Sequence, residues 1–226
     1  MFDRIAPRYD LLNHVLSCNV DRTWWWRTAR RFRDVLARPE ARVLDICCGT
    51  GDMTRALLRR RPAVAEPVVA ADFSVEMLAR ARKKLAGQRV EVIEADAMRL
   101  PFGDGSLDLI TTAFGFRNLA NYSAGLAEFF RVLAPGGQVG ILDFSEPGGI
   151  VGKAYAVYFR RMLPAIGRLI CGRDGPYSYL PASVERFPQP LEMLALMQTV
   201  GYVECEWQPY TFGIAGLYTG TRAAVA

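Results

Sequence analysis

The sequence of 226 residues is poor in metal ligands and in long apolar runs. It has one histidine, His14, and five scattered cysteines without C-x-x-C spacing, so no metal site is expected. The cysteines are predicted to be reduced core residues of a cytoplasmic protein. No apolar run reaches about 18 residues, which argues against a membrane-spanning helix. The early acid Asp3, with no apolar segment around it, argues against a signal peptide.

The composition is that of a globular protein, with 51% hydrophobic and 23% charged residues, and the length fits one domain with a full core. The net charge of +5 permits attraction to an anionic membrane surface or to nucleic acid. An amphipathic helix is predicted over residues 21–36. It is interpreted as a packing helix with a solvated arginine face, as a lid over a cofactor, or as a membrane-surface contact. Arginines and tryptophans alternate in this stretch, at Arg22, Trp24, Trp25, Trp26, Arg27, Arg30, Arg31, Arg33 and Arg38.

A strand, a glycine turn and a helix are predicted in succession from Val43, which is the opening of a nucleotide-binding βαβ unit. The turn holds Gly49 and Gly51, but Thr54 stands where the third glycine of a dinucleotide fingerprint would be. A ligand without phosphate, such as S-adenosylmethionine, fits this departure. Asp45 near the strand end suits its ammonium group, directly or through water. An ordinary αβ loop is the alternative interpretation.

Two further apolar strands also end in acids. Asp72 follows the strand 68–72 and is predicted to take both ribose hydroxyls, while Ser74 caps the next helix. Asp96 follows the strand 90–94 and could accept from an adenine amino group, with the Ala97 N–H donating to the ring. The alternative for Asp96 is a turn aspartate.

Strands and helices alternate from residue 42 to residue 144, which predicts a parallel sheet with helices on both faces. The ligand site is expected at the carboxyl ends of the strands, where the strand order switches. The predicted strands lie near 42–47, 68–72, 90–94, 107–113 and 138–144, and the predicted helices near 52–61, 74–86 and 121–133. A helix near 190–200 and a strand pair near 202–209 and 212–221 are predicted to follow.

These motifs, with Phe114-Gly-Phe-Arg-Asn118 and Arg131-Val-Leu-Ala-Pro-Gly-Gly137, resemble the class I S-adenosylmethionine-dependent methyltransferases. Within them the chain is similar to the UbiE/MenG group nearly end to end, from Met1-Phe-Asp-Arg-Ile-Ala-Pro-Arg-Tyr-Asp10 onward. The F-G-x-R-N stretch and this opening are more specific than the glycine turn. The resemblance implies an α/β Rossmann-like fold with a seven-stranded, mostly parallel sheet. One domain, 1–226, is predicted, made of an N-terminal arm and cap helix (1–40), a cofactor-binding core (41–146), a helical insertion before the last strand pair (147–190) and a C-terminal helix and strand pair (191–226). The insertion is predicted because it breaks the alternation of strands and helices. It is interpreted as covering the substrate, and a helical hairpin that packs in the core is the alternative.

The resemblance also implies a function, which is C-methylation of the quinol ring of a demethylated isoprenoid quinone. S-adenosylmethionine would be the donor and S-adenosylhomocysteine a product. Demethylmenaquinol is the favoured acceptor, and a polyprenyl-benzoquinol is the alternative. A nucleic-acid methyltransferase is disfavoured, because the chain lacks a polar-Pro-Pro-aromatic motif or a cysteine after the fourth strand. Transient contact with the inner face of the cell membrane is expected, and a homodimer is considered.

Methylation at a ring carbon needs a group that stabilises or forms a phenolate. Arg117 is the leading candidate because its cation can polarise an oxyanion, although it could instead pair with Asp104 or Asp108. Asn118 could orient a hydroxyl, and Tyr9 could reach the site from the arm. The predicted cofactor-binding residues are Asp45, Gly49, Thr50, Gly51, Asp72, Asp96, Ala97 and Ala113, and the predicted substrate-binding residues are Phe116, Tyr155, Phe159 and Tyr179.

Overall fold

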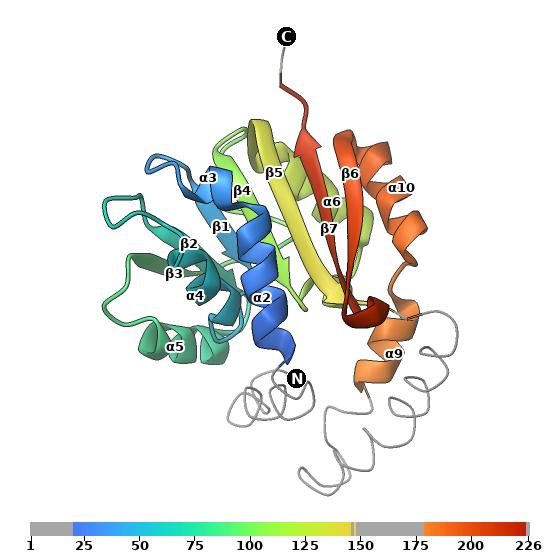
Figure 1. Ribbon diagram of the computed structural model, residues 1–226, viewed down its shortest axis with the longest axis horizontal. Helices are drawn as coiled ribbons and strands as arrows, with labels where there is room; N and C mark the ends of the chain where they lie inside the picture. The colour runs from blue at the N-terminus through green and yellow to red at the C-terminus, as the bar shows by residue number, and fades with distance from the viewer. Residues whose placement is uncertain (1–19, 146, 148–178, 225–226) are drawn as a thin grey trace, which may run out of the picture.

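The computed structural model describes residues 20–145, 147 and 179–224, without the side chains of residues 179–182. Its centre is a seven-stranded sheet in the order β3-β2-β1-β4-β5-β7-β6 (Figure 1). β7 runs antiparallel to both of its neighbours, and the pairs among β1 to β5 are all parallel. The sheet and its single antiparallel strand confirm the predicted fold. The strands are β1 Val43–Ile46, β2 Val68–Asp72, β3 Val90–Glu94, β4 Leu107–Ala113, β5 Leu133–Phe144, β6 Tyr202–Tyr210 and β7 Ala215–Arg222.

Helices cover both faces of this sheet, and each face has its own core. Val43 on β1 packs with Trp24, Phe32 and Leu57 beneath α2 and α4. The next residue, Leu44, points the other way, into the core formed with α6 and α10. The helices are α2 Val20–Arg31, α3 Arg33–Leu36, α4 Asp52–Leu58, α5 Val75–Lys84, α6 Tyr122–Val132, α9 Tyr179–Arg186 and α10 Pro190–Val200, with 3₁₀ turns at Phe116–Asn118 and Thr211–Gly213.

Several predicted element boundaries differ from the structure. Helix α4 ends at Leu58 rather than near 61, and β7 begins at Ala215 rather than near 212, after a 3₁₀ turn. The helix predicted over 21–36 is divided after Arg31, because Phe32 turns its ring into the core, against Gly140. A Cβ on Gly140 would lie 2.5 Å from that ring. The strand predicted from 138 begins at Leu133 directly after α6, and its register with β4 shifts between Leu107 and Leu109.

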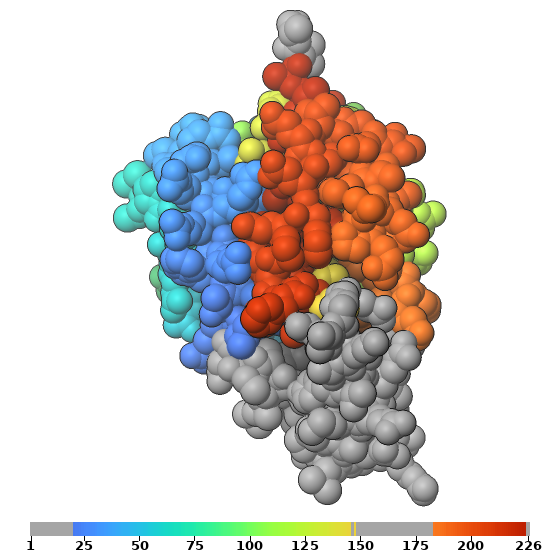
Figure 2. Space-filling view, turned by 45° about the vertical axis from the view of Figure 1, so that its right-hand side comes forward, coloured from blue at the N-terminus to red at the C-terminus, as the bar shows by residue number. Residues whose placement is uncertain are grey.

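Helix α2 lies against the β6–β7 hairpin, as Figure 2 shows for the two segments side by side. The Trp24 indole donates to the Thr211 hydroxyl at 2.8 Å, and the Arg27 guanidinium lies 4.2 Å from the centre of the Tyr210 ring. The packing role predicted for this helix is therefore confirmed, with Trp24 as its buried contact.

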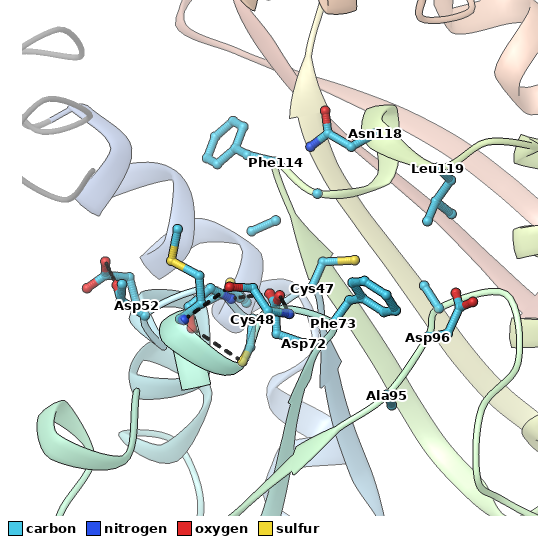
Figure 3. Close-up of a pocket in the computed structure, with 18 of the residues that line it drawn as sticks. Cys47, Cys48, Asp52, Asp72, Phe73, Ala95, Asp96, Phe114, Asn118 and Leu119 are labelled. Atoms are coloured by element: carbon cyan, nitrogen blue, oxygen red, sulfur yellow. Dashed lines mark hydrogen bonds between the residues drawn. The ribbon is translucent and has the colours of Figure 1, made fainter. Parts of the chain in front are cut away.

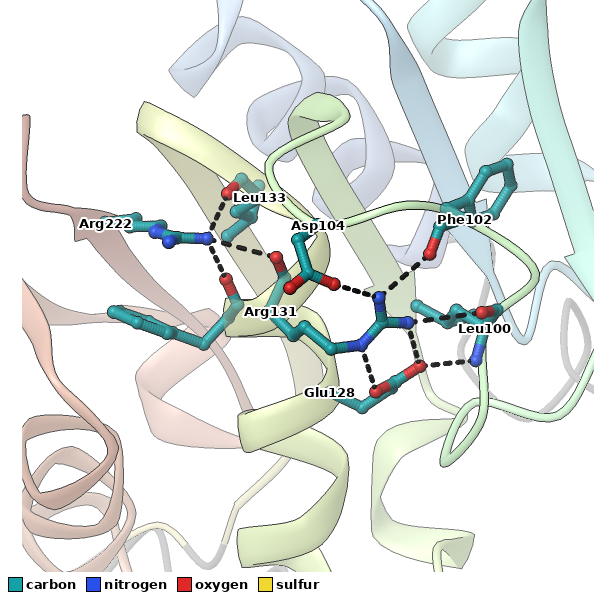
Figure 4. A network of polar contacts seen from close by, with 8 residues as sticks. Leu100, Phe102, Asp104, Glu128, Arg131, Leu133 and Arg222 are labelled. Atoms are coloured by element: carbon teal, nitrogen blue, oxygen red, sulfur yellow. Dashed lines mark hydrogen bonds and ion pairs between the residues drawn. The ribbon is translucent and has the colours of Figure 1, made fainter.

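Arg131 of α6 binds the loop that precedes β4 (Figure 4). Its guanidinium makes two hydrogen bonds to Glu128, at 2.7 and 2.9 Å, and one to Asp104 at 2.6 Å. It also donates to the Phe102 carbonyl at 2.9 Å. This loop and α6 are thereby joined at one end of the sheet.

Among the described residues, no helix combines the length and the apolar character needed to cross a bilayer.

Candidate active site

A cavity of about 410 Å³ lies at the carboxyl ends of the parallel strands, on both sides of the point where the order switches from β1 to β4. It therefore lies where the alternating pattern predicts it. In Figure 3, Phe114 and Asn118 lie above a row that contains Asp72, Phe73 and Asp96. The residues that line the cavity are Trp25, Cys47, Cys48, Gly49, Thr50, Asp52, Met53, Asp72, Phe73, Ser74, Met77, Ala95, Asp96, Ala97, Met98, Ala113, Phe114, Gly115, Asn118, Leu119 and Ala120.

The glycine turn after β1 contributes Gly49 and Thr50 to the cavity, as predicted. Gly49 has a φ of +55°, and its backbone N–H donates to an Asp72 oxygen at 2.8 Å. Gly51 does not line the cavity, in contrast to its prediction as a cofactor-binding residue. A Cβ on Gly51 would lie 2.8 Å from Leu85, so this glycine permits close packing of the turn against α5.

Asp45 is fully buried below the turn and does not line the cavity, which excludes the predicted direct contact with an ammonium group. The predicted contact through water stays a prediction. One carboxylate oxygen accepts from the Thr54 hydroxyl at 2.6 Å and the other from the Thr111 hydroxyl at 3.0 Å. Burial raises the pKa of Asp45 to about 7, although the threonine hydrogen bonds lower it. Thr54, which replaces the third glycine, thus has a structural function in joining α4 to β1.

Asp72 lines the cavity at the end of β2 and is held by backbone donors on two sides. One oxygen accepts from Gly49 N, and the other accepts from Ser74 N at 2.9 Å. Ser74 caps α5 as predicted, since its hydroxyl accepts from Met77 N.

Asp96 and Ala97 line the cavity beyond β3. The Asp96 carboxylate accepts from Met98 N at 2.8 Å, so the turn interpretation of this residue is correct, and its contact with an adenine stays a prediction. Phe73 lies between the two acids and is 74% exposed. Phe73 was not predicted from the sequence. The feature that could have indicated it is a large apolar residue directly after the acid that ends a strand.

The loop after β4 supplies Ala113, Phe114 and Asn118 to the cavity. Ala113 and Asn118 were predicted site residues, whereas Phe114 was missed because an aromatic residue after a buried strand is commonly part of the core. Phe116, predicted to bind substrate, is fully buried against Phe129, Phe187 and Tyr122. It therefore belongs to the core and does not reach the cavity.

Arg117 lies behind the cavity wall, with 7% of its surface exposed. Its guanidinium donates to Asp143 at 2.9 Å and also to the Phe114 carbonyl. This corrects the prediction that Arg117 faces an acceptor oxygen. The ion-pair alternative is correct in kind, but the partner is Asp143, because Asp104 pairs with Arg131 and Asp108 with Arg38.

The two cysteines at the end of β1 are neutral thiols. Burial raises the pKa of Cys47 and of Cys48 well above the usual range, and the Asp72 carboxylate raises both further. A neutral thiol is a poor nucleophile, so these residues do not form a site for covalent catalysis.

Four predicted residues are not placed by these contacts. Tyr9, Tyr155 and Phe159 lie outside the described residues, and Tyr179 begins α9 without a described side chain. Within the described ranges, no cluster of histidine, cysteine and acidic side chains could hold a metal ion.

Solved structures of low sequence identity share the fold. A methyltransferase from Aquifex aeolicus, described as S-adenosylmethionine-dependent, is similar with a TM-score of 0.62 and 19% identity, over 87% of this chain and 89% of that one. The trans-methyltransferase CalH in complex with S-adenosylhomocysteine is similar with a TM-score of 0.64 and 18% identity, over 91% of this chain and 60% of that one.

Curated relatives are much more similar in sequence. A demethylmenaquinone methyltransferase from Thermus thermophilus is 47% identical over 98% of this chain and 100% of its own length. A demethylmenaquinone methyltransferase from Deinococcus radiodurans is 45% identical over 98% of this chain and 91% of its own length. A ubiquinone/menaquinone biosynthesis C-methyltransferase from Geotalea daltonii is 42% identical, over 98% and 94%.

The profile of one family covers residues 1–222, nearly the whole chain. The chain belongs to the ubiE/COQ5 methyltransferase family.

Proposed function

We propose that this methyltransferase transfers the methyl group of S-adenosylmethionine to a ring carbon of demethylmenaquinol, forming menaquinol. The observation that carries the proposal is a cavity with two chemically different regions. Asp72, Phe73 and Asp96 lie along one side of it, and Phe114, Asn118 and Leu119 lie above them (Figure 3). The first region suits a nucleoside and the second suits an apolar ring. The relatives that are 45–47% identical, named demethylmenaquinone methyltransferases, support this acceptor.

The residues of the first region fit S-adenosylmethionine. Asp72 would accept from the ribose hydroxyls, and Gly49 and Thr50 would contact the amino-acid portion. Asp96 and the Ala97 N–H would bind the adenine, whose ring Phe73 would contact. The cofactor supplies an electrophilic methyl group on a sulfonium, and the chain contributes by holding this methyl near the acceptor carbon.

The acceptor carbon becomes nucleophilic when a quinol hydroxyl loses its proton, because the charge reaches the ortho position. Asn118 lines the cavity on the acceptor side, where its amide would orient this hydroxyl. Tyr9 remains a proposed second contact from the N-terminal arm, and Tyr155, Phe159 and Tyr179 remain proposed contacts for the ring or its tail.

Labelled methyl transfer tests this function. Reduced demethylmenaquinone should be methylated, a reduced demethylated benzoquinone more slowly, and DNA or transfer RNA not at all.

The variant Asp72→Ala should weaken S-adenosylmethionine binding by roughly 1–3 kcal/mol, measured by calorimetry, because ribose hydroxyls lose their acceptor. Glu94→Ala is the matched control, since this acid is exposed at the end of β3 and does not line the cavity. Faster transfer to the benzoquinol would favour the ubiquinone-pathway alternative, and transfer to a nucleic acid alone would refute the proposal.

The isoprenoid tail of such a substrate resides in a membrane, and α2 carries a surface suited to meet it. Trp26 is 50% exposed, and its ring lies between Arg30 and Arg60, whose guanidinium carbons are 5.3 and 5.5 Å from its centre. Exposed tryptophan flanked by arginine is typical of the interface between lipid headgroups and acyl chains. We propose that this surface makes a peripheral contact with anionic lipid.

Co-sedimentation with anionic vesicles at low salt measures this contact. Trp26→Ala should reduce the bound fraction, because the interfacial side chain is lost, and high salt should reduce it further by screening the arginines. Leu191→Ala is the control, since Leu191 is 80% exposed on α10, on the other face of the sheet. Equal binding by both variants and wild type would exclude the α2 surface.

A further inference from the structure

Phe114 has a backbone conformation that its residue type disfavours. Its φ is +58°, in the left-handed region that a bulky aromatic residue rarely adopts, and it lies directly at the cavity wall after β4. Such conformations persist where the surroundings impose them, and they are concentrated at functional sites. The contacts that hold Phe114 in this conformation therefore indicate the function of the loop after β4.

Both backbone polar groups of Phe114 are bound. Its N–H donates to the Leu142 carbonyl at 2.8 Å, and its carbonyl accepts from the Arg117 guanidinium. The same guanidinium nitrogen donates to one oxygen of Asp143, and the other oxygen of Asp143 accepts from Arg117 N at 3.0 Å. Asp143 is fully buried. The ion pair therefore joins the loop after β4 to β5 and fixes the peptide that follows Phe114.

The ring of Phe114 is also held from behind. It lies 4.6 Å from the Phe144 ring at an interplanar angle of 34°, and Trp24 contacts both rings at 5.8 and 6.2 Å. The Arg117 guanidinium lies 5.2 Å from the centre of the Phe144 ring, so the ion pair and the aromatic cluster form one unit. The two rings are tilted against each other, and Phe114 also lines the cavity.

We propose that Asp143 and Arg117 are positioning residues that orient Phe114 as an aromatic platform for the ring of the methyl acceptor. This inference rests on the proposed function in that the acceptor is aromatic. Arg117 acts through Phe114 and touches neither cofactor nor acceptor. Arginine suits this position because one guanidinium nitrogen donates to the Phe114 carbonyl and to Asp143, while the planar group lies over the Phe144 ring. The ammonium of lysine is not planar and does not reproduce the contact with the ring.

Steady-state kinetics with reduced demethylmenaquinone separate this role from the stabilisation of a phenolate. Phe114→Leu should raise the KM for the quinol about 3- to 10-fold, the size of one lost aromatic contact, with kcat nearly unchanged. Phe114→Tyr, which keeps the ring, should restore the KM. Arg117→Lys should raise the same KM, and the calorimetric affinity for S-adenosylmethionine should stay constant in all three variants. A fall in kcat with an unchanged KM in Arg117→Lys would overturn the proposal, because it would place the cation at the reacting oxygen.

A binding measurement keeps the inference separate from the proposed function and from folding defects. The affinity for 1,4-naphthoquinone, measured by calorimetry on the protein saturated with S-adenosylhomocysteine, needs no turnover. It should fall about 3- to 10-fold in Phe114→Leu and recover in Phe114→Tyr, even if wild type methylates no quinol. Equal affinity in wild type and Phe114→Leu would refute the platform, whatever the acceptor proves to be.

Discussion

At the scale of single residues, three carboxylates near the ends of parallel strands have different functions. Asp45 is enclosed by two threonine hydroxyls, Asp143 is bound to a guanidinium, and Asp72 is held by backbone amides at the cavity. These partners differ in charge, and this determines how each acid responds to burial. A carboxylate with only neutral partners keeps much of its desolvation penalty, which is why the pKa of Asp45 is raised.

Asp45 should make the stability of the protein depend on pH. Burial raises its pKa from 3.8 to about 7 in the folded state, so the folded protein binds this proton more tightly than the unfolded chain. The contribution is favourable below pH 3.8 and is lost as the pH rises toward about 7. Asp45→Asn removes this titration and retains the shape, since one threonine hydroxyl can donate to the amide oxygen and the other can accept from the amide nitrogen. Urea unfolding should show the variant gaining stability relative to wild type between pH 4.5 and 7.5, and a constant difference would contradict this assignment.

At the scale of secondary-structure elements, the ends of β1 and β4 approach each other closely at the cavity. Gly115 permits this approach, because a Cβ there would lie 2.3 Å from the Cβ of Cys47. Cys47 itself has a φ of +55°, so the ends of both strands carry residues in the left-handed region. The cavity wall at the switch point therefore depends on how these two strand ends pack.

Gly115→Ala should separate the two strand ends. We expect a loss of about 1–3 kcal/mol in unfolding free energy, typical of overpacking a tight site, together with weaker S-adenosylmethionine binding. Gly103→Ala is the control, because its Cβ would meet no atom within 4 Å and its φ does not require glycine. Thermal unfolding and calorimetry check both variants. A Gly115→Ala protein with wild-type stability and affinity would show that the strand ends can move apart freely.

At the scale of the whole molecule, charged side chains join segments that are far apart in sequence. Arg131 joins α6 to the loop before β4, and Arg222 of β7 donates to the last carbonyls of α6, including those of Phe130 and Leu133. These contacts lie at the end of the sheet away from the cavity, because β4 and β5 begin there. They hold the scaffold on which the strand ends of the site depend.

Glu128 should contribute to stability in acid with the opposite sign from Asp45. Hydrogen bonds from Arg131 lower its pKa, so its contribution is present above the unfolded value of 4.5 and is lost as the pH falls through the folded value. Glu128→Gln should therefore flatten the decline in melting temperature below about pH 5, measured by circular dichroism. Glu91→Gln, on the exposed side of β3, is the control and should follow wild type. Parallel curves for Glu128→Gln and wild type would show that the ion pair is absent from the folded protein in solution.

The sequence by itself determined the elements and the edge of the sheet at which the site lies. Periodicity and turn residues act locally: the apolar runs form β1 to β5, Ser74 caps α5, and Gly49 begins the turn after β1. Parallel strands meet at one edge, so acids that follow successive strands must gather there. This is why Asp72 and Asp96 could be assigned to one cavity before any contact was known.

Only the tertiary structure decided which polar residues face the cavity. Asp45 and Asp72 both lie near strand ends after apolar runs, yet one is buried beneath Thr54 and the other lines the cavity. Arg117 does not face the cavity because its guanidinium is bound to Asp143, which lies 26 positions away in the sequence. A buried polar side chain needs a hydrogen-bond or ion-pair partner, because burial without one costs free energy. In these cases the partner comes from a distant segment, so it is determined only when the strands and helices pack.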